Sequence, residues 1–294
     1  MIFAEGFIAV DWGTTNRRAY RIGTDGRHAA EYEDGLGVLS VPSGGFADAI
    51  AEIRARLGDL PMILAGMVGS NRGWMEVPYV PCPAGFPELA AAVTWAEPGR
   101  TAIVPGLSLC EGERADVMRG EEVQLLGAAK AGLIPADGLA CHPGTHNKWV
   151  VLEAGRIASF RTVMTGELFN HVKSHGILAD WLDRPVEVGD AFRAGVREGL
   201  KGGALGADLF AVRARVLLGL AQADDAASFT SGLLIGSDVG AGLAEGSGPV
   251  TIIGRPELTR LYAAALEAAG RAHREVDGED AFIAGVLEIV RNLS

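Results

Sequence analysis

The chain has 294 residues and a formal net charge of −11, and its composition is 48% hydrophobic and 21% charged. These values are typical of a globular protein, and the length allows two domains that each bury their own core. The negative charge argues against broad binding of nucleic acid or of an anionic membrane surface. No apolar stretch reaches the ~20 residues that span a bilayer, and no signal peptide is evident.

The first half of the chain predicts three strands joined by tight turns, followed by alternating helix and strand. The predicted strands are residues 6–11, 17–22, 28–32, 61–65 and 101–105, and the predicted helices are residues 46–57 and 121–131. Residues 66–74 form a polar loop after a buried strand, which is where α/β sheets place ligands. A proline-rich stretch over residues 78–83 predicts an extended loop.

The second half repeats this plan. Its predicted strands are residues 138–142, 148–152, 156–162 and 249–253, and its clearest helices are residues 258–269 and 281–293. A strand meander followed by alternation, twice over, predicts an α/β protein with two similar mixed sheets. We expect an N-terminal domain over 1–134 and a C-terminal domain over 135–294, with the final helix able to pack back on the first domain.

Three widely spaced cysteines and six scattered histidines give no metal-binding pattern. Cys82, Cys110 and Cys141 contain no CxxC pair, and the histidines form no HExxH motif. The sequence therefore favours a reducing, cytoplasmic environment and predicts no metal cluster.

Two glycine-threonine hairpins, near half-chain separation, are the strongest functional signal. Their residues are Gly13, Thr14, Thr15, Asn16 and Arg17 in the first, and Gly144, Thr145, His146, Asn147 and Lys148 in the second. Such turns present backbone N–H groups and threonine hydroxyls, which bind phosphate oxygens without net positive charge. Asp11, at the end of the preceding strand, suits Mg²⁺. The alternative is a pair of ordinary hairpins, but their matched strand contexts favour phosphate binding.

Charged side chains near these hairpins leave alternatives open. Arg17 and Arg18 alternate across a strand, so at most one of them faces the nucleotide. Lys148 could reach a phosphate, or could be an ordinary half-exposed strand residue.

The two hairpins resemble the phosphate motifs of the actin, Hsp70 and sugar-kinase superfamily, and four longer blocks are similar to the 2-dehydro-3-deoxygalactonokinase family. The blocks are LAGMVGSN (64–71), VMRGEEVQLLG (117–127), PGTH (143–146) and FRTVMTGELF (160–169). The resemblance implies two ribonuclease-H-like domains with an interdomain cleft. It also implies ATP- and Mg²⁺-dependent phosphorylation of the 6-hydroxyl of 2-dehydro-3-deoxy-D-galactonate, a step of galactonate breakdown.

The chain departs from the superfamily in two places. His142 stands where the second phosphate motif commonly begins with Asp, so it is not expected to bind metal. The adenosine motif commonly carries a glycine pair, and only Gly254 is present.

Related sugar kinases carry a catalytic base on a loop that enters a helix, shortly before the second phosphate motif. Glu121 is our first choice for this base and Glu122 our second, with Asp116 a weaker candidate. The alternative is that both glutamates simply complement the dipole of the helix that they begin.

An anionic sugar acid should be bound by a guanidinium or by amide donors. The candidate substrate-binding residues are Ser70, Asn71, Arg72, Trp74, Arg161 and Glu167. For Trp74 the alternative is packing on the core, for Arg161 a salt bridge, and for Glu167 a helix-dipole role.

Other functions remain open on the sequence alone. A kinase of the same fold could act on another sugar or sugar acid. Less favoured are an actin-like or chaperone-like ATPase and a non-catalytic sugar sensor. We expect a small-molecule substrate and neither nucleic acid nor membrane as a partner, and a homodimer stays open.

Overall fold

The computed structural model describes residues 2–293, which form two compact units. Unit 1 takes its described residues from Met1–Ala136, Glu153–Ser159 and Gly278–Ser294, and unit 2 consists of Asp137–Leu152 and Phe160–Asp277. The first change of unit falls close to the boundary predicted at residue 134. Unit 1 also contains two later segments of the chain, so it is not one continuous stretch of sequence.

Unit 1 is built on a six-stranded mixed sheet. Its strands are β1 (Phe7–Trp12), β2 (Arg17–Ile22), β3 (His28–Asp34), β4 (Met62–Gly66), β6 (Thr94–Glu97) and β7 (Thr101–Ile103). They are ordered β3-β2-β1-β4-β7-β6, with an antiparallel meander from β1 to β3 and with β4 and β7 parallel to β1. Strands β1 and β4 are almost wholly buried, which explains their continuous apolar runs.

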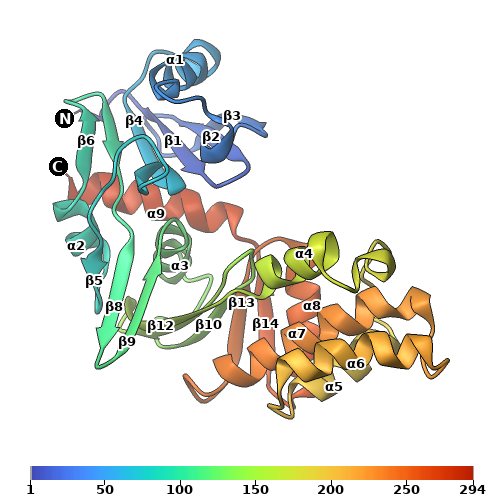
Figure 1. Ribbon diagram of the computed structural model, residues 1–294. Helices are drawn as coiled ribbons and strands as arrows, with labels where there is room; N and C mark the ends of the chain where they lie inside the picture. Colours follow the sequence, from blue (N-terminus) through green and yellow to red (C-terminus); the bar gives the residue numbers. More distant parts are fainter. Residues whose placement is uncertain (1, 294) are drawn as a thin grey trace. The chain divides into compact units, whose positions relative to one another are not determined.

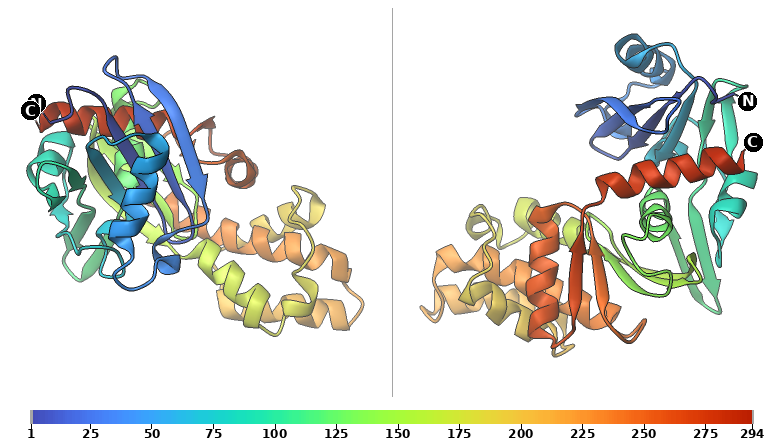
Figure 2. Two further views of the ribbon diagram at one scale, coloured as in Figure 1. Left: turned by 90° about the horizontal axis from the view of Figure 1, so that it is seen from above. Right: turned by 180° about the vertical axis from the view of Figure 1, so that it is seen from behind.

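Helices cover both faces of this sheet. The helices of unit 1 are α1 (Phe46–Leu57), α2 (Phe86–Ala91), α3 (Glu121–Lys130) and α9 (Glu279–Asn292). Ala19 packs with α1 in one core cluster, whereas the adjacent Tyr20 contacts Phe282 of α9, because successive strand residues point to opposite faces. Figure 1 and Figure 2 show α9 lying against the sheet of unit 1. The final helix therefore belongs to unit 1 and packs on its sheet.

A three-stranded sheet, absent from our sequence prediction, leads into α3. Its strands are β5 (Val80–Pro81), β8 (Leu107–Glu111) and β9 (Arg114–Met118), and their order is β5-β8-β9. Only Arg119 and Gly120 separate the end of β9 from the start of α3. This short connection fixes where the first turn of α3 begins.

Unit 2 contributes most of a five-stranded mixed sheet. Its strands are β10 (Gly138–His142), β11 (Asn147–Glu153), β12 (Arg156–Val163), β13 (Val250–Ile253) and β14 (His273–Val276). They are ordered β12-β11-β10-β13-β14, with β11 antiparallel to β10 and with β13 and β14 parallel to it. Strand β14 was not predicted from the sequence.

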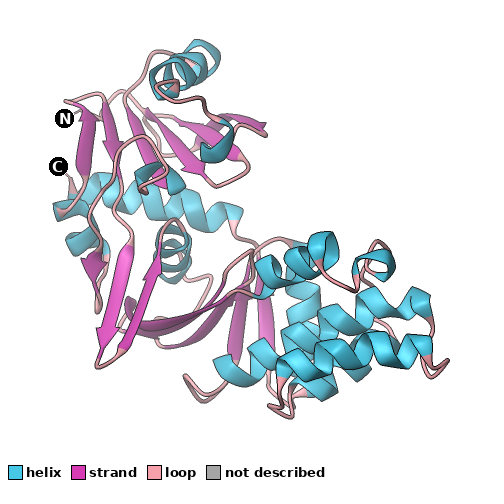
Figure 3. Cartoon of the chain, viewed as in Figure 1, coloured by secondary structure: helices cyan, strands magenta, loops and turns pink. Residues whose placement is uncertain are grey.

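The helices of unit 2 are α4 (Thr165–His175), α5 (Asp190–Gly199), α6 (Leu205–Leu217), α7 (Ala226–Gly242) and α8 (Pro256–Ala268). Figure 3 shows α5, α6 and α7 gathered into a helical layer. Among residues 2–293, no helix combines the length and the apolar character that crossing a bilayer requires.

The two sheets share one topology. In each, the first three strands form a meander in the order third, second, first, and the next strand pairs in parallel with the first. This repeated α/β arrangement is the ribonuclease-H-like fold, and it confirms the fold class expected from the repeated strand plan and from the family resemblance.

Candidate active site

The first hairpin, between β1 and β2, is held firmly and leaves its tip exposed. The Gly13 N–H donates to the Asn16 carbonyl at 2.9 Å, and the Gly13 carbonyl accepts from the Val38 N–H at 3.0 Å. A Cβ on Gly37 would lie 2.3 Å from the Thr14 carbonyl oxygen, so the following segment packs directly on the turn. Thr14, Thr15 and Asn16 are exposed. Their side-chain hydroxyl and amide groups therefore lie at the surface, where they suit a phosphate chain.

Arg17 corrects one prediction. Its side chain is completely buried, and its guanidinium donates to Asp34 at 2.9 and 3.0 Å and to Glu52 at 2.8 Å. The alternation of β2 turns Arg17 toward α1, where it also lies 5.2 Å from the ring centroid of Trp12. The expectation that this side chain binds ATP is wrong, because the guanidinium is committed to the core of unit 1.

Asp11 lies at a meeting point of three elements in unit 1. It is half-buried near the end of β1, and the Gln124 side chain of α3 donates to its Oδ2 at 3.4 Å. Gly66, at the end of β4, has a φ of +94°, and a Cβ there would come within 2.7 Å of the Trp12 carbonyl oxygen. Gly120 has a φ of +108°, and its Cβ would lie 3.1 Å from Gly66. The two glycines thus bring the start of α3 to the carboxyl ends of β1 and β4.

The two glutamates that begin α3 have different surroundings. Glu122 is completely buried, and its Oε2 accepts from the Gly120 N–H at 2.7 Å. Burial, together with the nearby Glu121 carboxylate, raises the pKa of Glu122 to about 8. Glu121 is half-buried and accepts from the Arg119 N–H at 3.1 Å. Of the two, only Glu121 keeps a partly solvent-accessible side chain.

The loop after β4 uses several of its polar side chains locally. Ser70 is buried, and its hydroxyl donates to the Met67 carbonyl at 2.7 Å and accepts from the Arg72 N–H at 3.2 Å. Trp74 packs against the core cluster of unit 1, which was the alternative considered for it. Asn71 is exposed. Of the predicted substrate residues in this loop, Asn71 alone combines an exposed side chain with amide donor and acceptor groups.

Arg119 lies beside this loop and was missed as a candidate. It is 8% exposed, its Nη2 donates to the Val77 carbonyl at 2.6 Å, and its guanidinium carbon lies 4.3 Å from the ring centroid of Tyr79. A Cβ on Gly69 would come within 2.9 Å of its Nη1. Its position two residues before the paired glutamates was the sequence signal that could have found it.

The second hairpin, between β10 and β11 of unit 2, rests on the start of α4. The Glu167 N–H donates to the Thr145 carbonyl at 2.9 Å, and a Cβ on Gly166 would lie 2.6 Å from the Gly144 carbonyl oxygen. The Glu167 carboxylate pairs with His146, and this hydrogen bond lowers the pKa of Glu167. Thr145 and His146 are exposed. The tip of this hairpin is thus presented much like that of the first.

The other predicted residues of unit 2 have mixed outcomes. Lys148 is buried, and its ammonium donates to the His146 carbonyl at 3.2 Å, so it braces the hairpin backbone. Arg161 forms an ion pair with Glu245 at 2.5 Å, which is the salt bridge considered as its alternative. Gly254 follows β13 directly and precedes α8, and its N–H donates to the Val276 carbonyl at 3.2 Å. The structure therefore gives Arg161 an internal partner, and it leaves the ligand roles of Lys148 and Gly254 as predictions.

Asp238 is the second residue that the sequence reasoning missed. It lies on α7, is 1% exposed, and accepts hydrogen bonds from Asn147 of the second hairpin. It is the single charged residue in the sequence of α7, which is otherwise rich in small and apolar residues. That isolation was the signal that could have found it.

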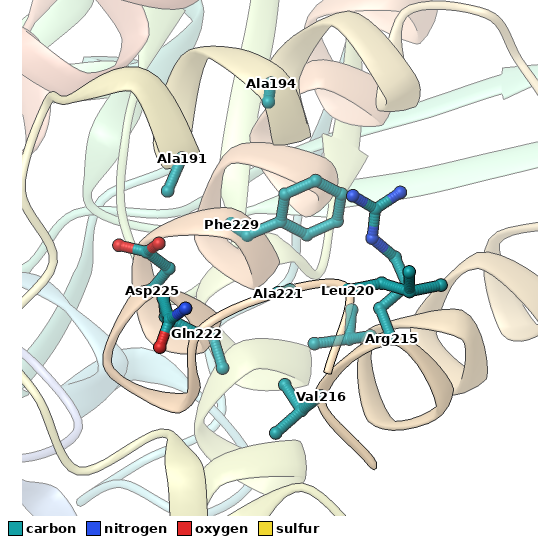
Figure 4. A pocket seen from close by; sticks show the side chains of 11 residues that line it. Ala191, Ala194, Arg215, Val216, Leu220, Ala221, Gln222, Asp225 and Phe229 are labelled. Carbon is teal, nitrogen blue, oxygen red and sulfur yellow. The ribbon is translucent and has the colours of Figure 1, made fainter. Parts of the chain in front are cut away.

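An apolar cavity of about 190 Å³ lies among α5, α6 and α7. Figure 4 shows Phe229 and Arg215 on its wall, with Asp225 and Gln222 nearby. None of the predicted site residues lines it.

Among the described residues, no group of three or more His, Cys, Asp or Glu is arranged to hold a metal ion. Mg²⁺ commonly needs only one or two carboxylates, because substrate phosphates and water complete its shell.

The fold and the paired hairpins place the chain in the actin-like ATPase and sugar-kinase fold class. The structure of the activator of 2-hydroxyisocaproyl-CoA dehydratase from Clostridium difficile, which holds ADPNP, aligns with a TM-score of 0.52. The alignment covers 98% of this chain and 95% of that chain at 10% identity, so the likeness concerns the fold alone.

Sequence comparison gives the particular family. The profile of the 2-keto-3-deoxy-galactonokinase family matches residues 11–289. The 2-dehydro-3-deoxygalactonokinase of Escherichia coli K12 is 37% identical over 288 residues, which cover 96% of this chain and 97% of the relative. A Sinorhizobium meliloti protein assigned to the same activity has a crystal structure that aligns with a TM-score of 0.90 at 37% identity, over 97% and 98% of the two chains. The chain belongs to the 2-keto-3-deoxy-galactonokinase family.

Proposed function

We propose that the protein transfers the γ-phosphoryl group of ATP to the 6-hydroxyl of 2-dehydro-3-deoxy-D-galactonate, within galactonate catabolism. The observation that carries this proposal is the family match over residues 11–289, which includes both hairpins and the start of α3. Relatives named for this activity align over almost their whole length. The rival readings, a protein-binding ATPase and a sugar sensor, have no comparable support.

ATP is proposed to bind through the exposed tips of the two hairpins. Gly13, Thr14, Thr15 and Asn16 would serve in unit 1, and Gly144, Thr145 and His146 in unit 2, with Lys148 bracing the second turn and Gly254 near the adenosine. Asp11 would hold Mg²⁺, directly or through water, since a half-buried carboxylate is a hard oxygen ligand. The ion neutralises phosphate charge when it is bound.

Glu121 is proposed as the base that accepts the proton of the 6-hydroxyl. Its support is the contrast with its neighbour: Glu122 is fully buried, and burial raises its pKa to about 8, which favours the protonated form. Glu121 has a half-buried side chain at the start of α3, close in the chain to Gln124, which contacts Asp11. A base must reach its substrate and must be ionised, and Glu121 satisfies the first condition better than Glu122.

Substrate binding is proposed for the loop after β4 and for the start of α4. Asn71 is exposed and offers amide groups, and Ser70 holds the turn through its hydroxyl. Trp74 packs against the core of unit 1 and is only partly buried, so its remaining exposed surface is what we propose as an apolar wall. Glu167 remains a candidate through its pair with His146. Arg161 is less suited to bind the substrate, because its guanidinium forms an ion pair with Glu245.

A substrate panel tests the proposal. Coupled ADP release should be measured with hexonates, 2-keto-3-deoxy sugar acids and neutral sugars, with 2-dehydro-3-deoxy-D-galactonate expected to give the highest kcat/KM. The Glu121→Gln variant tests the proposed base, because it removes the carboxylate but keeps the shape of the side chain. We expect it to lose ~10²–10⁴-fold in kcat and to retain ATP binding. Higher kcat/KM for a neutral sugar would contradict the substrate, and near-normal turnover of Glu121→Gln would contradict the base.

The proposed setting is the cytoplasm, where ATP is abundant. The three cysteines are free thiols, which is compatible with a reducing compartment.

A homodimer is also proposed, because α6 and its end expose the large apolar side chains Phe210, Leu217, Leu218 and Leu220. Sedimentation equilibrium would decide it.

A further inference from the structure

A buried carboxylate lies at the centre of a hydrogen-bond cluster in unit 2. Asp238 is 1% exposed and accepts from the Asn147 amide at 3.0 Å to each of its oxygens. The Trp149 indole N–H donates to it at 2.7 Å. The hydroxyls of Thr165 and Tyr262 donate to its Oδ2 at 2.5 and 2.6 Å. Four side chains thus converge on one carboxylate.

The chemistry of these partners shows that the carboxylate acts as an acceptor. The indole N–H can only donate, and the Asn147 amide is oriented because its carbonyl oxygen faces the Cys141 thiol at 3.4 Å. Burial raises the pKa of Asp238, and the four donors oppose that shift. An acceptor in the middle of four donors satisfies every member of the cluster, whereas removing it would leave buried donors unpaired.

The four donors come from the segments that build and support the second hairpin. Asn147 is the fourth residue of the hairpin and the first of β11, and Trp149 follows on the same strand. Thr165 is the first residue of α4, whose next two residues contact the backbone of Gly144 and Thr145. Tyr262 is on α8, the helix that begins just after Gly254. Asp238 therefore ties together the hairpin, the helix start beneath it and the helix that follows the adenosine segment.

We propose that Asp238 is the positioning residue of the second phosphate hairpin. Its carboxylate fixes Asn147 and the first residue of α4 in one geometry, so that the backbone and hydroxyl of the exposed Thr145 are arranged before ATP binds. Asp238 itself is buried beneath the hairpin and does not touch the ligand. The inference rests on the proposed function, because it takes the 144–148 hairpin to bind ATP phosphates.

The test is the near-isosteric Asp238→Asn variant, assayed well below its melting temperature. A hairpin that is no longer held in place should raise the KM for ATP by about 10- to 100-fold, whereas the KM for the sugar acid should change less than about twofold. A merely structural role would lower the amount of folded enzyme without separating the two KM values. Thr165→Val and Tyr262→Phe each remove one donor and keep the charge, so they should shift the KM for ATP in the same direction by a smaller factor.

Thr230→Val is the matched control. Thr230 is on the same helix, is fully buried, and its hydroxyl has no hydrogen-bond partner. We expect this variant to leave both KM values unchanged. The inference is overturned if the Asp238→Asn variant folds and keeps the wild-type KM for ATP, or if it raises both KM values equally. If that variant does not fold, unchanged KM values in both the Thr165→Val and the Tyr262→Phe variants overturn the inference.

A Thr145→Ala variant separates this inference from the proposed function. If Thr145→Ala leaves the KM for ATP unchanged, the role of the hairpin itself fails. If Thr145→Ala raises that KM and the Asp238, Thr165 and Tyr262 variants do not, only the role of Asp238 fails.

Discussion

At the residue scale, two buried carboxyl groups differ in how their charge is stabilised. Glu122 and Asp238 sit in the two units, each almost without solvent contact, yet they are stabilised differently. Asp238 accepts from four side chains, whereas Glu122 accepts from the backbone of Gly120 with Glu121 nearby. Burial without enough donors favours the protonated acid, which is why the pKa of Glu122 rises to about 8.

This shift predicts a pH dependence of stability. Between the usual pKa of 4.5 and the folded-state value of about 8, folded Glu122 holds a proton that the unfolded chain releases. The free energy of unfolding should therefore fall as pH rises through this window and become flat above it. Gln cannot titrate, so the stability of Glu122→Gln relative to the wild type should rise between pH 5 and pH 8.5.

Denaturant unfolding of both proteins at several pH values measures this difference. Other titrating groups are common to the two proteins and largely cancel in the comparison. A stability difference that does not change with pH would show that Glu122 is ionised in the folded state.

At the residue scale, the sequence singled out candidate residues but could not tell which of them are buried. The run Arg119 to Glu122 was identified as the place of the base, but Arg119 was overlooked and the two glutamates could not be told apart. Arg17 was assigned to the nucleotide, although it is paired with Asp34 and Glu52. Burial depends on segments that are distant in the chain, so adjacent residues of one type look alike until the chain is folded.

At the scale of elements, glycines set how closely two helices of unit 2 approach. A Cβ on Gly236 of α7 would lie 2.3 Å from the Val196 carbonyl oxygen of α5, and one on Gly232 would lie 2.1 Å from the Phe192 carbonyl oxygen. Backbone atoms cannot move aside as a flexible side chain can. The close contact of α5 and α7 therefore requires residues without side chains at these positions.

Gly236→Ala should destabilise the protein by ~1–3 kcal/mol, because the added methyl group overpacks the contact between the helices. Gly240→Ala is the matched control, since Gly240 is one turn further along α7, is exposed and has open space around its Cα. That change should be neutral or stabilising by up to ~1 kcal/mol, through helix propensity. Thermal melts of both variants provide the measurement, and equal effects on the melting temperature would refute the packing argument.

At the scale of the whole molecule, chain order and structural unit do not coincide. The last helix, α9, belongs to unit 1 and packs against α3, where a Cβ on Gly285 would come within 2.2 Å of the Val123 carbonyl oxygen. Phe282 is 2% exposed and lies 5.9 Å from the ring of Tyr20, between centroids. Unit 1 is therefore complete only when the C-terminal segment has been added.

Phe282→Ala should therefore weaken unit 1, by ~3–5 kcal/mol for the loss of a buried phenyl ring. Hydrogen exchange should then accelerate in β1, β2 and β4 more than in the strands of unit 2. Phe192→Ala removes an equally buried ring from the core of unit 2 and should accelerate exchange in α7 and β11 instead. If Phe282→Ala accelerates hydrogen exchange mainly in the strands of unit 2, α9 is not an integral part of unit 1.

The sequence by itself determined the duplicated α/β plan, the two glycine-threonine hairpins, Asp11 at the end of its strand and the acidic start of α3. These are local patterns of apolar periodicity and turn residues, and local interactions are enough to specify them. The tertiary structure alone decided that Arg17 faces the core, that Glu122 is buried beside Glu121, and that Asp238 lies beneath a hairpin about ninety residues earlier in the chain. Burial and hydrogen-bond partnership arise from contacts between distant segments, and these control charge state and position without leaving a periodic pattern in the sequence.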